Sequence, residues 1–157
     1  MASVPTHVTM RNGASRGALI DFVRPYDQQI KFVLDQLDGD KLWAWCLWRA
    51  PEGTDLRMDL PDSDNYMQCA GTAQKMTIEV RTVDSDGTVN QYTVGRTPPE
   101  GWSQKTEEPS EIIHWDRGRR SLRIYPHEVF DSEEAAAIFF DYFQTDGVSA
   151  PYVIREF

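Results

Sequence analysis

The residues of this chain that could support acid–base or metal chemistry are three histidines, two cysteines and a scattered set of carboxylates. His7, His114 and His127 do not lie at a spacing that suits a metal ion or a nucleophile with its base. Cys46 and Cys69 lie in apolar, strand-like settings outside any CxxC pair, so we expect buried free thiols rather than a disulfide. The pattern nominates no catalytic residue, metal site or cofactor, and we expect a protein that is not an enzyme.

One acidic stretch, "DSDG" at residues 84–87, begins like a calcium-binding loop. No Glu follows at the twelfth position of that loop, where calcium sites of this kind need a bidentate ligand. The Asp86–Gly87 pair lies between two segments of alternating hydrophobicity, which is typical of a tight hairpin turn. We therefore predict a hairpin here and no metal ion.

A second acidic stretch, "PEGTDLRMDLPDSDNY" at residues 51–66, carries its carboxylates against the single Arg57. Such a field could steer a basic protein partner and raise the rate of encounter. The plainer alternative is a solvated edge and loop. The residues that we nominate for partner binding in this stretch are Asp55, Asp59, Asp62 and Asp64.

The proline-bracketed segment 97–110, "TPPEGWSQKTEEPS", is the other candidate for partner binding. Long loops in compact domains are disproportionately functional. Trp102 could either fold back to cover the core or act as an aromatic anchor in an interface. The residues nominated here are Glu100, Trp102, Glu107 and Glu108.

The overall charge narrows the classes of partner. The chain has 25 Asp and Glu against 16 Lys and Arg, a formal net charge of −9. This balance argues against direct binding to nucleic acid or to an anionic membrane and favours a basic protein partner. The basic run 117–120 is interpreted as a solvated turn. The sequence contains neither the apolar core of a secretory signal nor an apolar run long enough to span a bilayer, so we expect a cytoplasmic protein.

The elements that must position these residues fit one domain over residues 1–157, with residues 1–17 expected to be loose. Helical spacing of apolar residues predicts a helix from near Pro25 to Gly39. The segment "KLWAWCLWRA" is apolar on both alternating sets, which is typical of a strand covered on both faces. The segments "TDLRMDL" and "KMTIEVRTV" alternate as half-exposed strands do.

The C-terminal part predicts a second hairpin, a helix and a last strand. The hairpin joins "EIIHW" to "SLRIY", and the helix begins at Asp131 or Ser132, with acidic residues in its first turn. Its predicted buried face consists of Ala136, Phe139, Phe140 and Phe143. Gly147 is expected to end it, and Pro151 leads into "YVIREF". We predict an α+β fold: a largely antiparallel, twisted sheet of about six or seven strands with about two helices packed against it.

From about Gln91 to Phe157, this order of elements resembles the C-terminal half of bacterial immunity proteins paired with deaminase toxins in polymorphic toxin systems. That family has a helix of the form E-A-A-x-x-F-F-x-x-F-x-T-x-G, then Pro and a strand that often carries a Trp. The matching positions here are Glu134, Ala135, Ala136, Phe139, Phe140, Phe143, Thr145, Gly147 and Pro151, with Phe157 near the place of the Trp.

The resemblance implies a non-enzymatic inhibitor that protects the producing cell by binding a cognate toxin, with a deaminase as the expected target and nucleases or other toxin chemistries as alternatives. Two other hypotheses stay open at this point. One is a small ligand-binding domain or enzyme whose cleft is lined by Trp43, Trp45 and Trp48. The other is an acidic mimic of nucleic acid that inhibits a DNA-binding enzyme.

Overall fold

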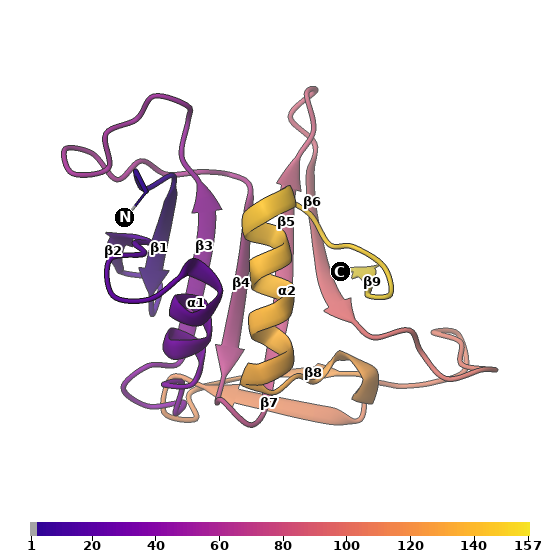
Figure 1. The fold of residues 1–157 in the computed structure, drawn as a ribbon. Helices are drawn as coiled ribbons and strands as arrows, with labels where there is room; N and C mark the ends of the chain where they lie inside the picture. The colour runs from indigo at the N-terminus through magenta and orange to yellow at the C-terminus, as the bar shows by residue number, and fades with distance from the viewer. Residues whose placement is uncertain (1–2) are drawn as a thin grey trace.

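A computed structural model describes residues 3–157 (Figure 1). Seven strands form an antiparallel sheet in the order β2-β1-β3-β4-β5-β6-β9: β1 (His7–Arg11), β2 (Ser15–Ala18), β3 (Ala44–Arg49), β4 (Tyr66–Gly71), β5 (Met76–Val83), β6 (Val89–Gly95) and β9 (Val153–Glu156). A separate hairpin consists of β7 (Glu111–Trp115) and β8 (Arg120–Ile124). The helices are α1 (Tyr26–Leu34), the short 3-10 helix η1 (Pro126–Glu128) and α2 (Ser132–Thr145). The predicted α+β fold is confirmed.

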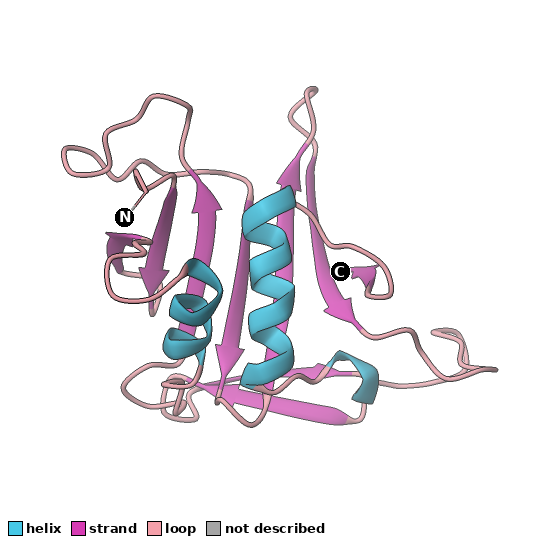
Figure 2. Cartoon of the chain, viewed as in Figure 1, coloured by secondary structure: helices cyan, strands magenta, loops and turns pink. Residues whose placement is uncertain are grey.

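Both α-helices lie on the same face of the sheet, which we call the helix face (Figure 2). The apolar residues of α1 and α2 share one core with inward residues of the strands, including Ile30, Trp45 and Phe139. The Trp45 and Phe139 rings lie 5.2 Å apart between their centroids. Phe140 and Phe143 are only half-buried at the margin of this core, so the predicted buried face of α2 is correct for Ala136 and Phe139 and too wide at those two positions.

Local sequence signals explain the ends of α2 and the β5–β6 hairpin. The Asp131 side chain accepts a hydrogen bond from the Glu134 backbone N–H at 3.0 Å, as an N-cap does. Helix α2 ends at Thr145, and its C-cap is Asp146 in the left-handed conformation (φ 61°), one residue before the predicted Gly147. The β5–β6 hairpin forms as predicted, with Gly87 at φ 87°.

Three expectations about local structure are corrected. Residues 7–18 are not loose: β1 pairs with β2 and β3, and the buried Val8 lies opposite Trp48. Residues 1–2 lie outside the described part. The segment "TDLRMDL" is not a strand but part of a loop between β3 and β4, because its backbone turns at Asp55, whose carbonyl accepts from the Met58 and Asp59 N–H groups. Helix α1 ends at Leu34, before Gly39.

The sheet face opposite the helices, which we call the open face, carries the other alternating set of side chains. Along β4 and β5, Met67 and Ile78 enter the helix-face core, whereas Gln68 and Glu79 pair across the open face. The β7–β8 hairpin lies across one end of the sheet (Figure 1). At the contact, Gly71 (φ 129°) leaves no space for a side chain, since a Cβ atom there would lie 3.0 Å from Ile113.

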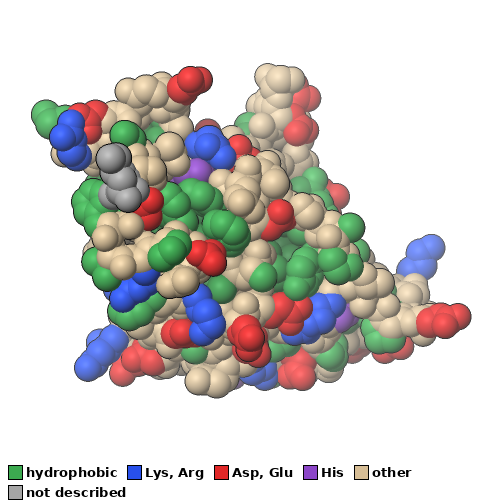
Figure 3. Space-filling model, viewed as in Figure 1, with side chains coloured by type: hydrophobic (Ala, Val, Ile, Leu, Met, Phe, Trp, Pro, Cys, Tyr) green, Lys and Arg blue, Asp and Glu red, His purple; other side chains and the backbone are tan. Residues whose placement is uncertain are grey.

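The helix face shows no accumulation of one sign of charge. Figure 3 views this face, and acidic and basic side chains are interspersed along it beside patches of hydrophobic side chains. Exposed hydrophobic residues include Phe22 and Val23, which precede α1, and Phe32, which lies within it and carries the Arg24 guanidinium over its ring. The carboxylates nominated for partner binding lie in the loops of segments 51–66 and 97–110.

Candidate partner-binding site

The β6–β7 loop, residues 96–110, forms a hollow of about 590 Å³ against the segment 125–127. We call this concave surface the loop hollow. The four residues nominated in the loop all line the hollow: Glu100, Trp102, Glu107 and Glu108. The structure therefore brings this part of the predicted site together around one concave surface.

Aromatic contacts hold the loop hollow in shape. The half-buried Trp102 ring packs edge-on against Tyr125 and His127, with centroid separations of 4.9 Å in both cases. The Tyr125 hydroxyl donates to the Glu107 backbone carbonyl at 3.2 Å. Trp102 has thus folded back onto the body of the protein, and one part of its ring surface still lines the hollow. A pre-shaped hollow loses less conformational entropy on binding than a free loop.

The charges around the loop hollow favour a cation. Glu100, Glu107 and Glu108 are exposed and form no ion pair with any residue of the range 3–157. Arg96 also lines the hollow, but Glu134 already pairs with it, at 2.6 Å between Nη2 and Oε1. Burial lowers the pKa of His127 from its usual value, so its ring is neutral at pH 7.

The acidic loop, residues 51–65, is the second nominated surface. Leu56 is buried against Val8, Cys46 and Trp48 of the open face, so the loop covers one side of that face. The Trp48 indole N–H donates to the Pro61 carbonyl at 2.9 Å. These contacts fix the loop, although it has no regular secondary structure.

Only some aspartates of the acidic loop are available to a partner. Asp55 binds Arg57, which lowers the pKa of that carboxyl group through hydrogen bonding, and Asp62 pairs with Arg16. Asp59 and Asp64 are exposed and have no cationic partner within the described chain. Next to Asp59, the Met58 side chain is 84% exposed.

The two nominated surfaces lie at opposite corners of the molecule (Figure 1). The acidic loop follows β3 at one edge of the sheet, and the loop hollow follows β6 toward the other. The structure therefore does not combine the eight nominated residues into one site. Sequence reasoning also missed Tyr125 and His127, whose adjacency to Trp102 depends on the return of the chain after the β7–β8 hairpin.

The open face contains a further cavity, which bears on the hypothesis of a cleft lined by three tryptophans. Trp43 and Trp45 line this cavity, together with Trp115 of the hairpin. Trp48 does not, because it packs beneath the acidic loop. The alternation of Thr77, Glu79 and Arg81 along β5 was the sequence signal for a polar set of side chains on this face.

Within residues 3–157, no group of three His, Cys, Asp or Glu side chains is arranged to hold a metal ion. Both cysteines are buried and free, as predicted. Of the helices described, none has the length and apolar character needed to cross a bilayer. The fold and the loops thus define an α+β domain with two separate acidic surfaces. No family model, curated protein or solved structure matches the chain.

Proposed function

We propose that this protein is an immunity protein that neutralises a cognate bacterial toxin by forming a stoichiometric complex, and that the toxin is a deaminase acting on nucleic acid or nucleotides. The toxin class rests on the sequence resemblance in the C-terminal half, and the proposed place of action is the cytoplasm. The observation that carries the binding part of the proposal is the loop hollow, which is lined by an aromatic wall and by three carboxylates that have no ion-pair partner among residues 3–157.

Such a hollow suits a lysine or arginine side chain of a basic protein. The carboxylates of Glu100, Glu107 and Glu108 would attract the cation over a distance and speed the encounter. A cation placed over the Trp102 ring contributes about 0.5–2 kcal/mol, depending on how far it is desolvated. A toxin acting on nucleic acid needs a positively charged substrate groove, so an acidic inhibitor can occupy that groove and exclude the substrate.

The test is co-expression with the toxin encoded beside this gene. Host survival and a one-to-one complex in size-exclusion chromatography are expected. Killing of the host despite soluble expression of both proteins would refute the proposal.

The binding surface is tested by neutralising the three glutamates of the loop hollow together. The variant Glu100→Gln, Glu107→Gln, Glu108→Gln should reduce the association rate at least about tenfold, and more strongly at low salt. A matched control changes the charge equally at three exposed carboxylates elsewhere: Asp84→Asn, Glu133→Gln and Glu156→Gln. An equal decrease of the association rate in both variants would show a general effect of net charge, and the hollow would then not be part of the interface.

The acidic loop is tested separately because it lies at another corner of the molecule. Charge reversal at Asp59, Asp62 and Asp64 should weaken binding if the toxin also reaches this loop, and Trp102→Ala should weaken it through the hollow. Wild-type affinity in both variants would place the interface elsewhere.

A second candidate function is a small ligand-binding domain. It is favoured by the cavity beside Trp43 and Trp45 on the open face.

A further inference from the structure

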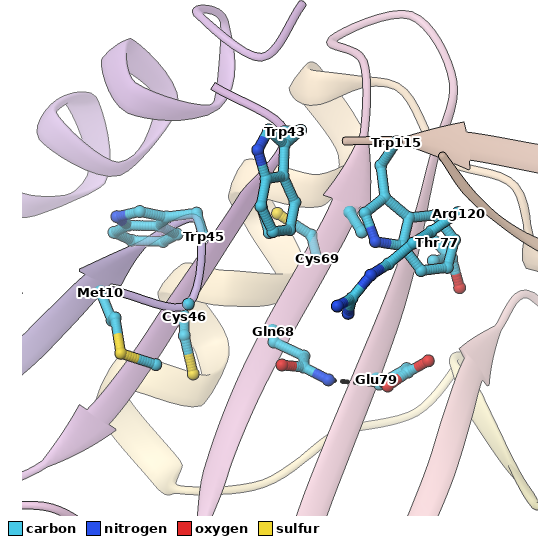
Figure 4. A pocket seen from close by; sticks show the side chains of 13 residues that line it. Met10, Trp43, Trp45, Cys46, Gln68, Cys69, Thr77, Glu79, Trp115 and Arg120 are labelled. Atoms are coloured by element: carbon cyan, nitrogen blue, oxygen red, sulfur yellow. Dashed lines mark hydrogen bonds between the residues drawn. The ribbon is translucent and has the colours of Figure 1, made fainter. Parts of the chain in front are cut away.

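The open-face cavity has a volume of about 220 Å³ and is lined by residues of the central strands, the β1–β2 turn and the β7–β8 hairpin. Figure 4 shows its lining: Trp43 and Trp115 stand over the sheet, and the Arg120 side chain extends past Trp115 toward Gln68 and Glu79. The lining residues come from six strands, β1, β3, β4, β5, β7 and β8, and from the segments next to them, so the cavity is a product of the tertiary fold.

Its hydrogen-bonding groups are oriented. Glu79 Oε2 accepts from Gln68 Nε2 at 2.8 Å and from Gln91 Nε2 at 3.1 Å. These two bonds leave Glu79 Oε1 and the Gln68 amide oxygen as acceptors without a partner in the described chain. The Arg120 guanidinium likewise makes no hydrogen bond or ion pair within residues 3–157, although Glu79 lines the same cavity. The cavity therefore presents two acceptors and a strong donor.

Thr77 provides an independent observation. This residue lines the cavity, is 2% exposed, and its buried Oγ1 has no hydrogen-bond partner in the part of the chain that the structure describes. Arg81 Nε and Thr93 Oγ1, from the same face of the sheet, are also buried without a partner. Buried polar side chains in native proteins are nearly always satisfied, so the Thr77 hydroxyl in the cavity lining indicates a place for a polar group of a ligand. Arg81 and Thr93 do not line the cavity.

The tryptophans define the shape of that ligand. Trp43 precedes β3 and Trp115 ends β7, and indole rings bind flat, conjugated groups by stacking. The cavity is smaller than the roughly 300–1,000 Å³ typical of pockets for drug-sized molecules, so it suits one ring system.

We propose that the open-face cavity binds a single nucleobase with the hydrogen-bonding pattern of guanine. The ring N–H on the pairing edge of guanine would meet Glu79 Oε1. The Gln68 amide oxygen lies at the far end of the Gln68–Glu79 hydrogen bond, so it does not accept from the adjacent amino group (Figure 4). The carbonyl oxygen of guanine would accept from Arg120, since arginine is a favoured donor to guanine acceptors. Adenine has a ring acceptor in place of that ring N–H and an amino group in place of the carbonyl, so its pairing edge would set an acceptor against Glu79 and a donor against Arg120. This inference goes beyond the proposed toxin binding and does not depend on it.

The net charge of −9 disfavours phosphates, so nucleosides are the appropriate probes. Guanosine and adenosine are titrated up to about 1 mM, a range that detects weak binding. Binding is followed by tryptophan fluorescence and by the indole N–H signals in ¹H–¹⁵N NMR spectra. We expect saturable binding of guanosine, at least about tenfold tighter than adenosine, because one well-matched base contact discriminates by that factor or more.

Variants locate the site. Glu79→Gln and Arg120→Leu should each weaken guanosine binding at least about tenfold, whereas Glu52→Gln, an exposed carboxylate outside the cavity, should not. Arg120 is exposed, so its variant keeps the test valid if Glu79→Gln fails to fold. Absence of saturable binding, equal affinity for adenosine, or unchanged affinity in Arg120→Leu would overturn the inference. Each of these results leaves the toxin-binding test unaffected, because the toxin is absent.

Discussion

Replacing Arg155 by alanine removes the cation from a buried ion pair that fastens β9 to η1. Arg155 donates to Glu128 through Nε at 2.7 Å and Nη2 at 2.9 Å. The Glu128 side chain is 1% exposed and that of Arg155 is 21% exposed. After the substitution, the described hydrogen bonds to the Glu128 carboxylate are reduced to the one from the Tyr125 N–H, at 2.9 Å.

Removing one partner of a buried ion pair costs about 3–5 kcal/mol, because the remaining charge is left uncompensated. Arg155 is partly exposed and water would reach the carboxylate, so we expect the lower value, about 3 kcal/mol. For a chain of this length, that loss corresponds to a decrease of roughly 6–12 °C in Tm. Urea unfolding followed by circular dichroism gives the free energy, and calorimetry gives Tm.

Two further variants isolate the cause. Glu128→Gln added to Arg155→Ala should recover about 1–2 kcal/mol, because the amide carries no charge to desolvate. Lys75→Ala breaks the exposed Lys75–Glu111 pair, whose side chains are 45% and 40% exposed, and should cost less than about 1 kcal/mol. If the double variant has the same free energy of unfolding as Arg155→Ala, the destabilisation comes from the lost packing of Arg155 over the Tyr125 ring. That result would refute the reasoning from charge.

Three other predictions concern stability and reactivity. Burial, with the nearby charge of Arg49, lowers the pKa of His7 to about 4, below the 6.5 of the unfolded chain, so stability should fall as pH decreases from about 6.5 to 4. Urea titrations should show this loss in the wild type but not in His7→Phe. Burial raises the pKa of Cys46 to about 12 and also raises the pKa of Cys69. Both thiols should therefore react with a disulfide reagent only as fast as the protein opens. Rapid labelling of the native protein would contradict this prediction. Asp131→Ala should cost about 1 kcal/mol and Asp131→Asn much less, measured by urea unfolding, and an equal cost would exclude the helix cap as the cause.

The parts of the fold that the sequence predicts are those determined by neighbouring residues. Asp131 with two glutamates in the following turn marks the start of α2, and Asp86–Gly87 marks the β5–β6 turn. Strand β1 was missed because its stability comes from pairing with β3, about forty positions away in the chain. The segment 54–60 alternates as a strand does, yet it turns at Asp55 and leaves Met58 in solvent, because no neighbouring strand pairs with it.

The candidate sites follow the same division. Glu100, Trp102, Glu107 and Glu108 belong to one loop, and their proximity could be expected from the sequence. The wall that Trp102 packs against could not, because the β7–β8 hairpin intervenes before Tyr125. The open-face cavity could not be predicted from the sequence either, since its acidic and basic residues, Glu79 and Arg120, lie on strands of different sheets.

The geometry of the two acidic surfaces limits how one toxin could engage both. The acidic loop packs on the open face through Leu56, and the loop hollow rests on the segment next to Gly95, whose Cβ would lie 3.0 Å from His127. A single partner that touched both would have to span the sheet, and by crossing the open face it would cover the open-face cavity. Toxin binding would then exclude guanosine, whereas a toxin confined to the loop hollow would leave guanosine affinity unchanged. Competition between the two ligands therefore distinguishes a partner that spans the sheet from one that binds at its corner.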